Sequence, residues 1–177
     1  MREMGSRRKQ IRLAGAALVV IGIIWAAGSG WGAPRGDTRQ SREQILEASL
    51  AKGTDWRIVT ESQVADYIVS GGVSSDGMAT IAVFAPEGAG KYRFYTATNR
   101  SRNHPMLAGA TINGSWYDLC WFPDARTEYA LLIYTANGET QTLRFDTGDG
   151  AIIANPAPQG DYTLQARYVD GDGIWYE

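Results

Sequence analysis

Residues 128–146 read EYALLIYTANGETQTLRFD, and this stretch decides the fold class. Asn137-Gly138 in its middle is a residue pair that two-residue hairpin turns prefer, because both positions require a positive φ angle. The flanking runs are rich in Tyr, Ile, Leu, Thr and Phe. The stretch therefore predicts an antiparallel hairpin formed by residues 128–135 and 140–146.

Similar runs, separated by Gly, Asp, Asn and Pro, continue through the region from residue 56 to residue 177. Asp76-Gly77 and Asn113-Gly114 are further turn signals. The other predicted strands are residues 64–70, 78–85, 91–98, 116–122, 162–169 and 174–176. No long amphipathic pattern separates these strands, which disfavours βαβ units and a parallel sheet. We expect a mainly β domain over residues 54–177, an antiparallel β-sandwich of the Ig-like kind or a similar fold.

The charge of this 177-residue chain is unevenly distributed. Residues 1–12 hold five basic residues and one acid, and residues 13–34 hold no charge. Residues 35–177 hold twelve basic and eighteen acidic residues, a net charge of −6. An acidic main domain is a poor binder of nucleic acid, because phosphate binding needs a basic surface. The basic head before an apolar run is instead typical of membrane targeting.

Residues 13–34 are long enough to span a hydrocarbon core of about 30 Å as a helix. The positive-inside rule keeps residues 1–12 in the cytoplasm and places the main domain outside the membrane. The segment is thus a transmembrane signal-anchor, or a signal peptide whose cleavage would release a secreted domain. Its small residues would permit a weak homodimer through the membrane helix, although ordinary use of Gly and Ala in membrane spans explains them equally well. These residues are Gly15, Gly22, Ala26 and Gly30.

Residues 35–53 are expected to be a polar spacer and a short helix. Ser41 and Gln44 have the spacing of a capping box, which places the helix over residues 42–52. Its apolar residues Ile45, Leu46 and Leu50 lie on one face, and a helix this short needs a surface to pack on.

Several aromatic runs of the main domain resemble a group of small membrane-anchored or secreted proteins of Gram-positive bacteria. They are Ile81–Phe84 with Gly90–Tyr92, Trp116–Leu119 with Trp121-Phe122, and the ending from Asp146 to Glu177. The resemblance covers residues 56–177. The group has no assigned activity, so the resemblance implies no catalytic or cofactor-binding residue.

The residues that usually carry chemistry are sparse. One Cys and one His exclude an internal disulfide and zinc clusters built from several Cys or His ligands. His104 lies in a polar loop, and Cys120 lies in an apolar strand. No nucleophile elbow, P-loop or dinucleotide-binding motif occurs. We therefore expect no catalytic residue, no metal and no cofactor.

A small glycan hydrolase remains an alternative, because two carboxylates at a suitable separation can cleave a glycosidic bond. Asp118, Asp124 and Glu128 are the acidic residues that lie closest to the aromatic run 116–122. A structural subunit of a membrane complex is a third reading, with residues 13–34 as the assembly element.

The favoured interpretation is a membrane-tethered binding or interaction module of the cell envelope, with another envelope protein or a cell-wall glycan as its partner. Large aromatic side chains supply much of the contact area at binding surfaces. The candidate ligand-binding residues are Trp116, Tyr117, Trp121 and Trp175.

Overall fold

A computed structural model describes residues 35–50, 54–123 and 127–176. It contains one α-helix, α1 (Arg39–Ser49), and a short 3-10 helix, η1 (Gly148–Gly150). The strands are β1 (Trp56–Val64), β2 (Tyr67–Ser74), β3 (Met78–Gly88), β4 (Lys91–Ser101), β5 (Met106–Ile112), β6 (Ser115–Trp121), β7 (Thr127–Ala136), β8 (Glu139–Asp146), β9 (Ile153–Pro156), β10 (Tyr162–Asp170) and β11 (Trp175–Tyr176).

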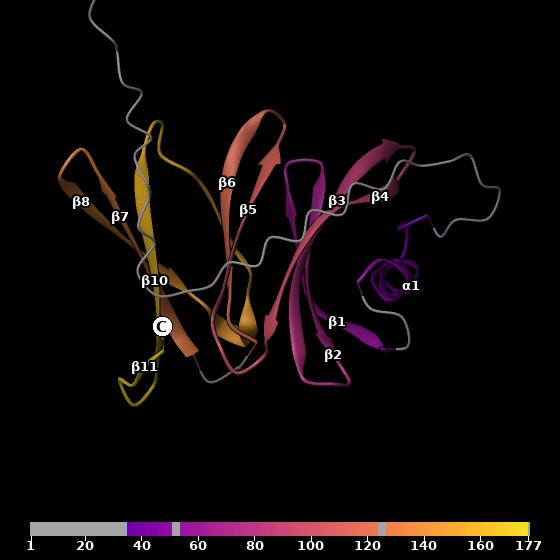
Figure 1. Ribbon diagram of the computed structural model, residues 1–177, viewed down its shortest axis with the longest axis horizontal. Coiled ribbons are helices and arrows are strands. Elements are labelled where there is room, and N and C mark those ends of the chain that lie inside the picture. The colour runs from indigo at the N-terminus through magenta and orange to yellow at the C-terminus, as the bar shows by residue number, and fades with distance from the viewer. Residues whose placement is uncertain (1–34, 51–53, 124–126, 177) are drawn as a thin grey trace, which may run out of the picture.

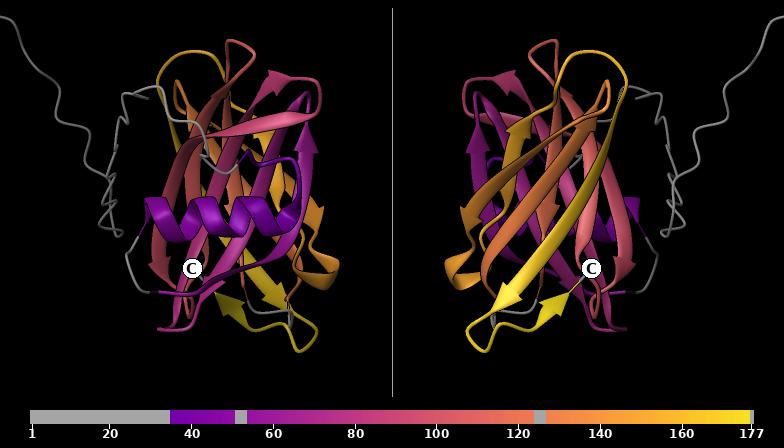
Figure 2. Two further views of the ribbon diagram at one scale, coloured as in Figure 1. Left: turned by 90° about the vertical axis from the view of Figure 1, so that its right-hand side faces the viewer. Right: turned by 90° about the vertical axis from the view of Figure 1, so that its left-hand side faces the viewer.

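The strands form three antiparallel sheets, which stack as layers (Figure 1). Sheet A has the order β1-β2-β3-β4, sheet B the order β5-β6-β9, and sheet C the order β11-β10-β7-β8. Helix α1 lies across the outer face of sheet A, and Figure 2 shows that no described helix covers the outer face of sheet C. Separate hydrophobic clusters lie between α1 and sheet A, between sheets A and B, and between sheets B and C.

The mainly β, antiparallel prediction is confirmed, but an Ig-like domain has two sheets and this domain has three. Sheet B is covered on both faces, so the side chains on both faces of β6 are buried from Asp118 to Trp121. Strands β5 and β9, which complete sheet B, were not among the predicted strands. Their sequences explain this, because β5 is rich in Ala and Gly and β9 contains Asn155 and Pro156.

Turn chemistry fixes two hairpins; the one at Asn137-Gly138 was predicted as a hairpin, and the one at Asn113-Gly114 was predicted only as a turn. Asn137 and Gly138 have φ angles of 53° and 83°, and Asn113 and Gly114 have φ angles of 48° and 79°. Positive φ at both central residues is the signature of a type I′ turn, whose twist matches that of the flanking strands. The register follows directly, with Ala136 opposite Glu139.

Helix α1 begins earlier than predicted. Thr38, rather than Ser41, is the N-cap, and Ser41 is the third helical residue of the capping box. The Ser41 amide donates to Thr38 Oγ1 at 3.1 Å, and Ser41 Oγ accepts from the Thr38 amide at 3.0 Å. The spacing of Ser41 and Gln44 gave the wrong N-cap because a Ser can also be the third helical residue of a capping box, as Ser41 is here. The predicted helix end at residue 52 lies outside the described residues.

The residues around α1 are part of the packed domain rather than a loose spacer. The Gly36 amide donates to the Tyr92 carbonyl at 2.9 Å, and Ile45 and Leu46 are buried against sheet A. A buried ion pair reinforces this packing. Arg42 Nε donates to Glu61 Oε1 at 2.8 Å, and Arg42 Nη2 donates to Glu61 Oε2 at 2.9 Å.

The predicted basic head 1–12, the predicted membrane segment 13–34 and its stripe of small residues lie outside the described residues. Within the described part of the chain, no helix combines the length and the apolar character needed to cross a membrane.

Candidate functional site

The four aromatic residues proposed from the sequence do not form one surface. Strand β6 alternates, so Tyr117 and Trp121 face sheet A, where they contribute to the cluster between sheets A and B. Trp116 lies on the opposite face of β6, at the end of the strand, and is 51% exposed. Trp175 is also 51% exposed, but it lies on β11 of sheet C.

Trp121, which was expected to contact a ligand, is a core residue whose side chain does not reach the surface. It is 1% exposed, and its indole fills the space that the absent side chain of Gly71 leaves. An ideal Cβ at Gly71 would lie 2.8 Å from Trp121 Cε2. The indole nitrogen donates to the Gly150 carbonyl at 3.0 Å, which satisfies the one polar atom of the side chain.

Tyr117 lies on the opposite face of β6 from Trp116, and Trp175 lies on a different strand, β11. Tyr117 is half-buried against the cluster between sheets A and B. Trp175 has Arg167 over its ring, with Cζ 5.5 Å from the ring centroid. The face of that ring is thus already engaged by a cation of the same chain.

Trp116 is held in a defined position at the end of sheet B. Its indole lies against Gly109 of the neighbouring strand β5, where an ideal Cβ would come within 2.8 Å of Cε2 and closer still to Cζ2. Only glycine leaves room for the ring there. The Trp116 side chain lies near the Asp118 carboxylate and the Tyr162 hydroxyl. The exposed indole is therefore fixed by its packing on Gly109.

Asp118 lies beside Trp116 and is only 6% exposed. Alternation along β6 puts both side chains on the face toward sheet C. Tyr162 of β10 donates its hydroxyl to Asp118 at 2.9 Å from Oδ1 and 3.1 Å from Oδ2. Tyr134 of β7 also hydrogen bonds to this carboxylate. Asp118 thus links sheets B and C at one end of their interface.

The electrostatics of this cluster are unusual for an acidic side chain. Burial raises the pKa of Asp118, and the hydrogen bonds from Tyr162, Tyr134 and Trp116 lower the pKa by less. Burial and the hydrogen bond to Asp118 also raise the pKa of Tyr162, to about 12. Asn155 of β9 completes the cluster, because its Nδ2 donates to the Tyr134 hydroxyl at 3.0 Å.

Of this cluster, the sequence identified Trp116 as a ligand contact and Asp118 as one acid of a carboxylate pair. It did not identify Tyr134, Tyr162 or Asn155. The alternation of β6 could have placed Trp116 and Asp118 on one face. The other three come from strands that meet β6 only through the stacking and pairing of the sheets.

The acid pair of a glycosidase is not formed by Asp118 and Glu128. Asp118 contacts Tyr134, and Glu128 is six residues earlier on the same strand, about 20 Å away along it at about 3.3 Å per residue. Inverting glycosidases keep their carboxylates within roughly 10 Å of each other. Asp124 lies outside the described residues.

His104 and Cys120 lie in different environments. His104 is exposed in the loop between β4 and β5, whereas Cys120 is fully buried between sheets B and C. Burial raises the pKa of the Cys120 thiol far above its ordinary value, and the negative charge of Asp118 raises it further. A buried neutral thiol is a poor nucleophile.

The acidic residues near the C-terminus serve a turn. Asp170 Oδ1 accepts the backbone amides of Asp172 and Ile174 at 3.0 and 2.8 Å, and Asp170 Oδ2 accepts the Tyr176 hydroxyl at 2.9 Å. In the part of the chain that the structure describes, no three His, Cys, Asp or Glu side chains are grouped as a metal site would need.

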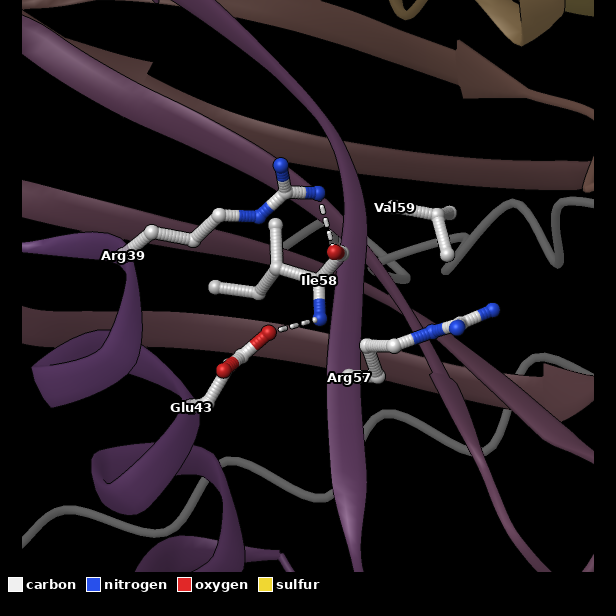
Figure 3. A pocket seen from close by; sticks show the side chains of 5 residues that line it. All are labelled: Arg39, Glu43, Arg57, Ile58 and Val59. Atoms are coloured by element: carbon white, nitrogen blue, oxygen red, sulfur yellow. Dashed lines mark hydrogen bonds between the residues drawn. The ribbon is translucent and has the colours of Figure 1, made fainter.

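A shallow hollow lies beside α1 on the edge strand β1 (Figure 3). Its lining residues are Arg39, Glu43, Arg57, Ile58 and Val59. Glu43 Oε1 accepts the Ile58 amide at 2.8 Å, and Arg39 donates to the Ile58 carbonyl. Two charged side chains of the hollow are thus engaged with the backbone of β1, so we assign this hollow to helix docking rather than to a ligand.

No family model, no curated protein and no solved structure matches this chain. The resemblance to small envelope proteins of Gram-positive bacteria stays a prediction. The features of this chain that bear on function are therefore the Trp116 cluster and the charge pattern of the sequence.

Proposed function

We propose that this protein is a membrane-tethered binding module of the cell envelope and that its ligand surface is the Trp116 end of sheet B. The observation that carries the proposal is an exposed indole held rigidly over Gly109 beside a buried, hydrogen-bonded carboxylate. The tether is residues 13–34, and the positive-inside rule gives the extracytoplasmic location.

The rigidity of Trp116 supports a binding role. An exposed aromatic ring is common on protein surfaces, but most such rings lose side-chain entropy when a ligand orders them. Trp116 is already ordered by its close packing on Gly109. A ligand that stacks on the outer face of the indole therefore avoids that cost.

The chemistry of the cluster suits recognition rather than catalysis. Asp118 accepts hydrogen bonds from neutral donors, and the described carboxylate Glu128 is too distant to act with it. An aromatic face bordered by hydroxyl and amide groups fits a cell-wall glycan, whose sugar rings have an apolar C–H face and hydroxyl groups at the edge.

The test is co-sedimentation of the purified full chain, in detergent, with insoluble cell-wall sacculi. We expect the wild-type chain to sediment with the sacculi. Trp116→Ala should weaken binding about tenfold, as for the loss of a central aromatic anchor. The matched control is Trp175→Ala, because Trp175 has the same exposed fraction of 51%.

Two results would contradict the proposal. One is that the wild-type chain stays in the supernatant over a wide range of sacculus concentrations. The other is that Trp116→Ala and Trp175→Ala bind as well as the wild-type chain. Circular dichroism of each variant checks that the fold is retained.

A further inference from the structure

Sheet B carries one charged side chain. Among the residues of β5, β6 and β9, Asp118 is the sole Asp, Glu, Lys or Arg. Its hydrogen-bond donor is the neutral hydroxyl of Tyr162, and the neutral side chains of Tyr134 and Trp116 lie beside it. A buried carboxylate is usually paired with a cation, because removing a charge from water is costly. The contrast is Glu61, which pairs with Arg42.

The surface around Asp118 adds negative charge. Asp161 precedes Tyr162, and Glu139 lies opposite Ala136, the residue that pairs with Tyr162. Both Asp161 and Glu139 are exposed. The segments that form this end of sheets B and C contain no Lys or Arg; they are residues 111–118, 134–141 and 155–163.

Aromatic rings coincide with this acidic end. Trp116 is half-exposed, and the rings of Tyr134 and Tyr162 lie 5.7 Å apart, centroid to centroid, at 52°. A cation over an aromatic face is attracted by the ring quadrupole, most strongly over Trp.

We propose that the Trp116 end of sheet B binds its ligand through an ammonium group, held over the Trp116 indole and attracted by the carboxylate of Asp118. The inference rests on the proposed function, since it takes Trp116 as the ligand surface. It adds the class of the ligand, a wall or envelope component that bears a quaternary or a primary ammonium group.

The Asp118 carboxylate attracts the ammonium group from behind the indole and does not contact it, because Asp118 is only 6% exposed. Electrostatic attraction across a poorly hydrated protein interior is much stronger than across water. Trp175 shows the same pairing satisfied internally, with Arg167 over its ring. Among the described residues, no Lys or Arg is recorded over the ring of Trp116.

The test is isothermal titration of the full chain, in detergent, with two matched pairs of probes. Choline is compared with 3,3-dimethyl-1-butanol, its neutral isostere, and glucosamine is compared with N-acetylglucosamine. We expect the charged member of at least one pair to bind at least about fivefold more tightly than its neutral partner. Binding of choline alone identifies a quaternary ammonium ligand, and binding of glucosamine alone identifies a primary one.

Three variants test the assignment. Asp118→Asn keeps an acceptor for Tyr162 but removes the charge, and should reduce the preference for the charged probe to the part that the Trp116 ring provides. Gly109→Ala should weaken binding by displacing the indole while leaving Asp118 in place. Trp175→Ala should bind as the wild-type chain does. Melting temperatures of all three confirm folding.

Equal binding of charged and neutral probes would overturn the inference, and so would an unchanged charge preference in folded Asp118→Asn. Absence of binding by all four probes would overturn it as well. In each case, Trp116-dependent sedimentation with sacculi would leave the proposed function intact, because that assay does not depend on the charge of the probe.

Discussion

Replacement of Arg42 by Met should be among the most costly single changes at the interface between α1 and sheet A. Arg42 donates to both carboxylate oxygens of Glu61 and, at 2.7 Å, to the Gly36 carbonyl. Methionine fills a similar volume but leaves Glu61 with Ser70 as its remaining described side-chain donor, at 2.8 Å. The variant therefore isolates an unpaired, partly buried carboxylate.

The magnitude follows from burial. Removing one partner of a buried ion pair costs about 3–5 kcal/mol. The side chain of Glu61 remains 23% exposed, so water recovers part of this, and we expect a loss of about 3 kcal/mol. At a urea dependence of about 2 kcal/mol per molar, the unfolding midpoint should fall by about 1.5 M.

The loss should depend on pH. Burial raises the pKa of Glu61, but the hydrogen bonds from Arg42 and Ser70 and the charge of Arg42 lower it below 4.5 in the folded state. A carboxylate with a lowered pKa stabilises the fold above its unfolded pKa, and that stabilisation disappears as the pH falls through the folded pKa. The difference between wild-type and Arg42→Met should therefore shrink below about pH 4.5.

The assay is urea unfolding followed by circular dichroism between pH 3 and pH 7, with Glu61→Gln and the double variant completing a mutant cycle. The double variant should lose less than the sum of the single losses, because the pair is removed as a unit. A midpoint shift below about 0.3 M for Arg42→Met, or a shift that does not change with pH, would refute the reasoning.

Two further predictions concern the boundary and the location of the domain. A fragment of residues 35–177 should unfold cooperatively and stay soluble. A fragment of residues 54–177 should aggregate, because it exposes the apolar face of sheet A on which Ile45 and Leu46 pack. Equal solubility and equal urea midpoints of the two fragments would count against the packing role of α1. Protease added to intact spheroplasts should digest the main domain if residues 13–34 hold it outside the membrane, and protection until lysis would reverse the topology.

Local turn chemistry explains how much of the fold could be predicted. The turns at Asn113-Gly114 and Asn137-Gly138 are specified by residues that tolerate positive φ, so they were recognisable without any knowledge of the rest of the chain. The existence of sheet B as a separate layer was not recognisable, because it depends on the pairing of β6 with β9. These two strands are distant in sequence, and no local pattern encodes their pairing.

The candidate site divides in the same way. Residue type marked Trp116 and Trp121 equally, because an aromatic ring suits both a core and a surface. What separates them is the neighbouring strand, since Gly71 opens a space for Trp121 inside the domain and Gly109 supports Trp116 at its end. Tyr134 and Tyr162 reach Asp118 only because sheet C packs on sheet B.

The route of β9 has a consequence for the order in which the domain folds. Sheet A is a simple meander of β1 to β4, built from strands that are consecutive in sequence. After β7 and β8 the chain leaves sheet C, completes sheet B as β9, and returns to sheet C as β10. Neither sheet B nor sheet C can be completed before the other has begun to form. Because local contacts form faster than distant ones, sheet A should be structured early during synthesis, and sheets B and C should then form together in one later, slower step that needs β9 and β10.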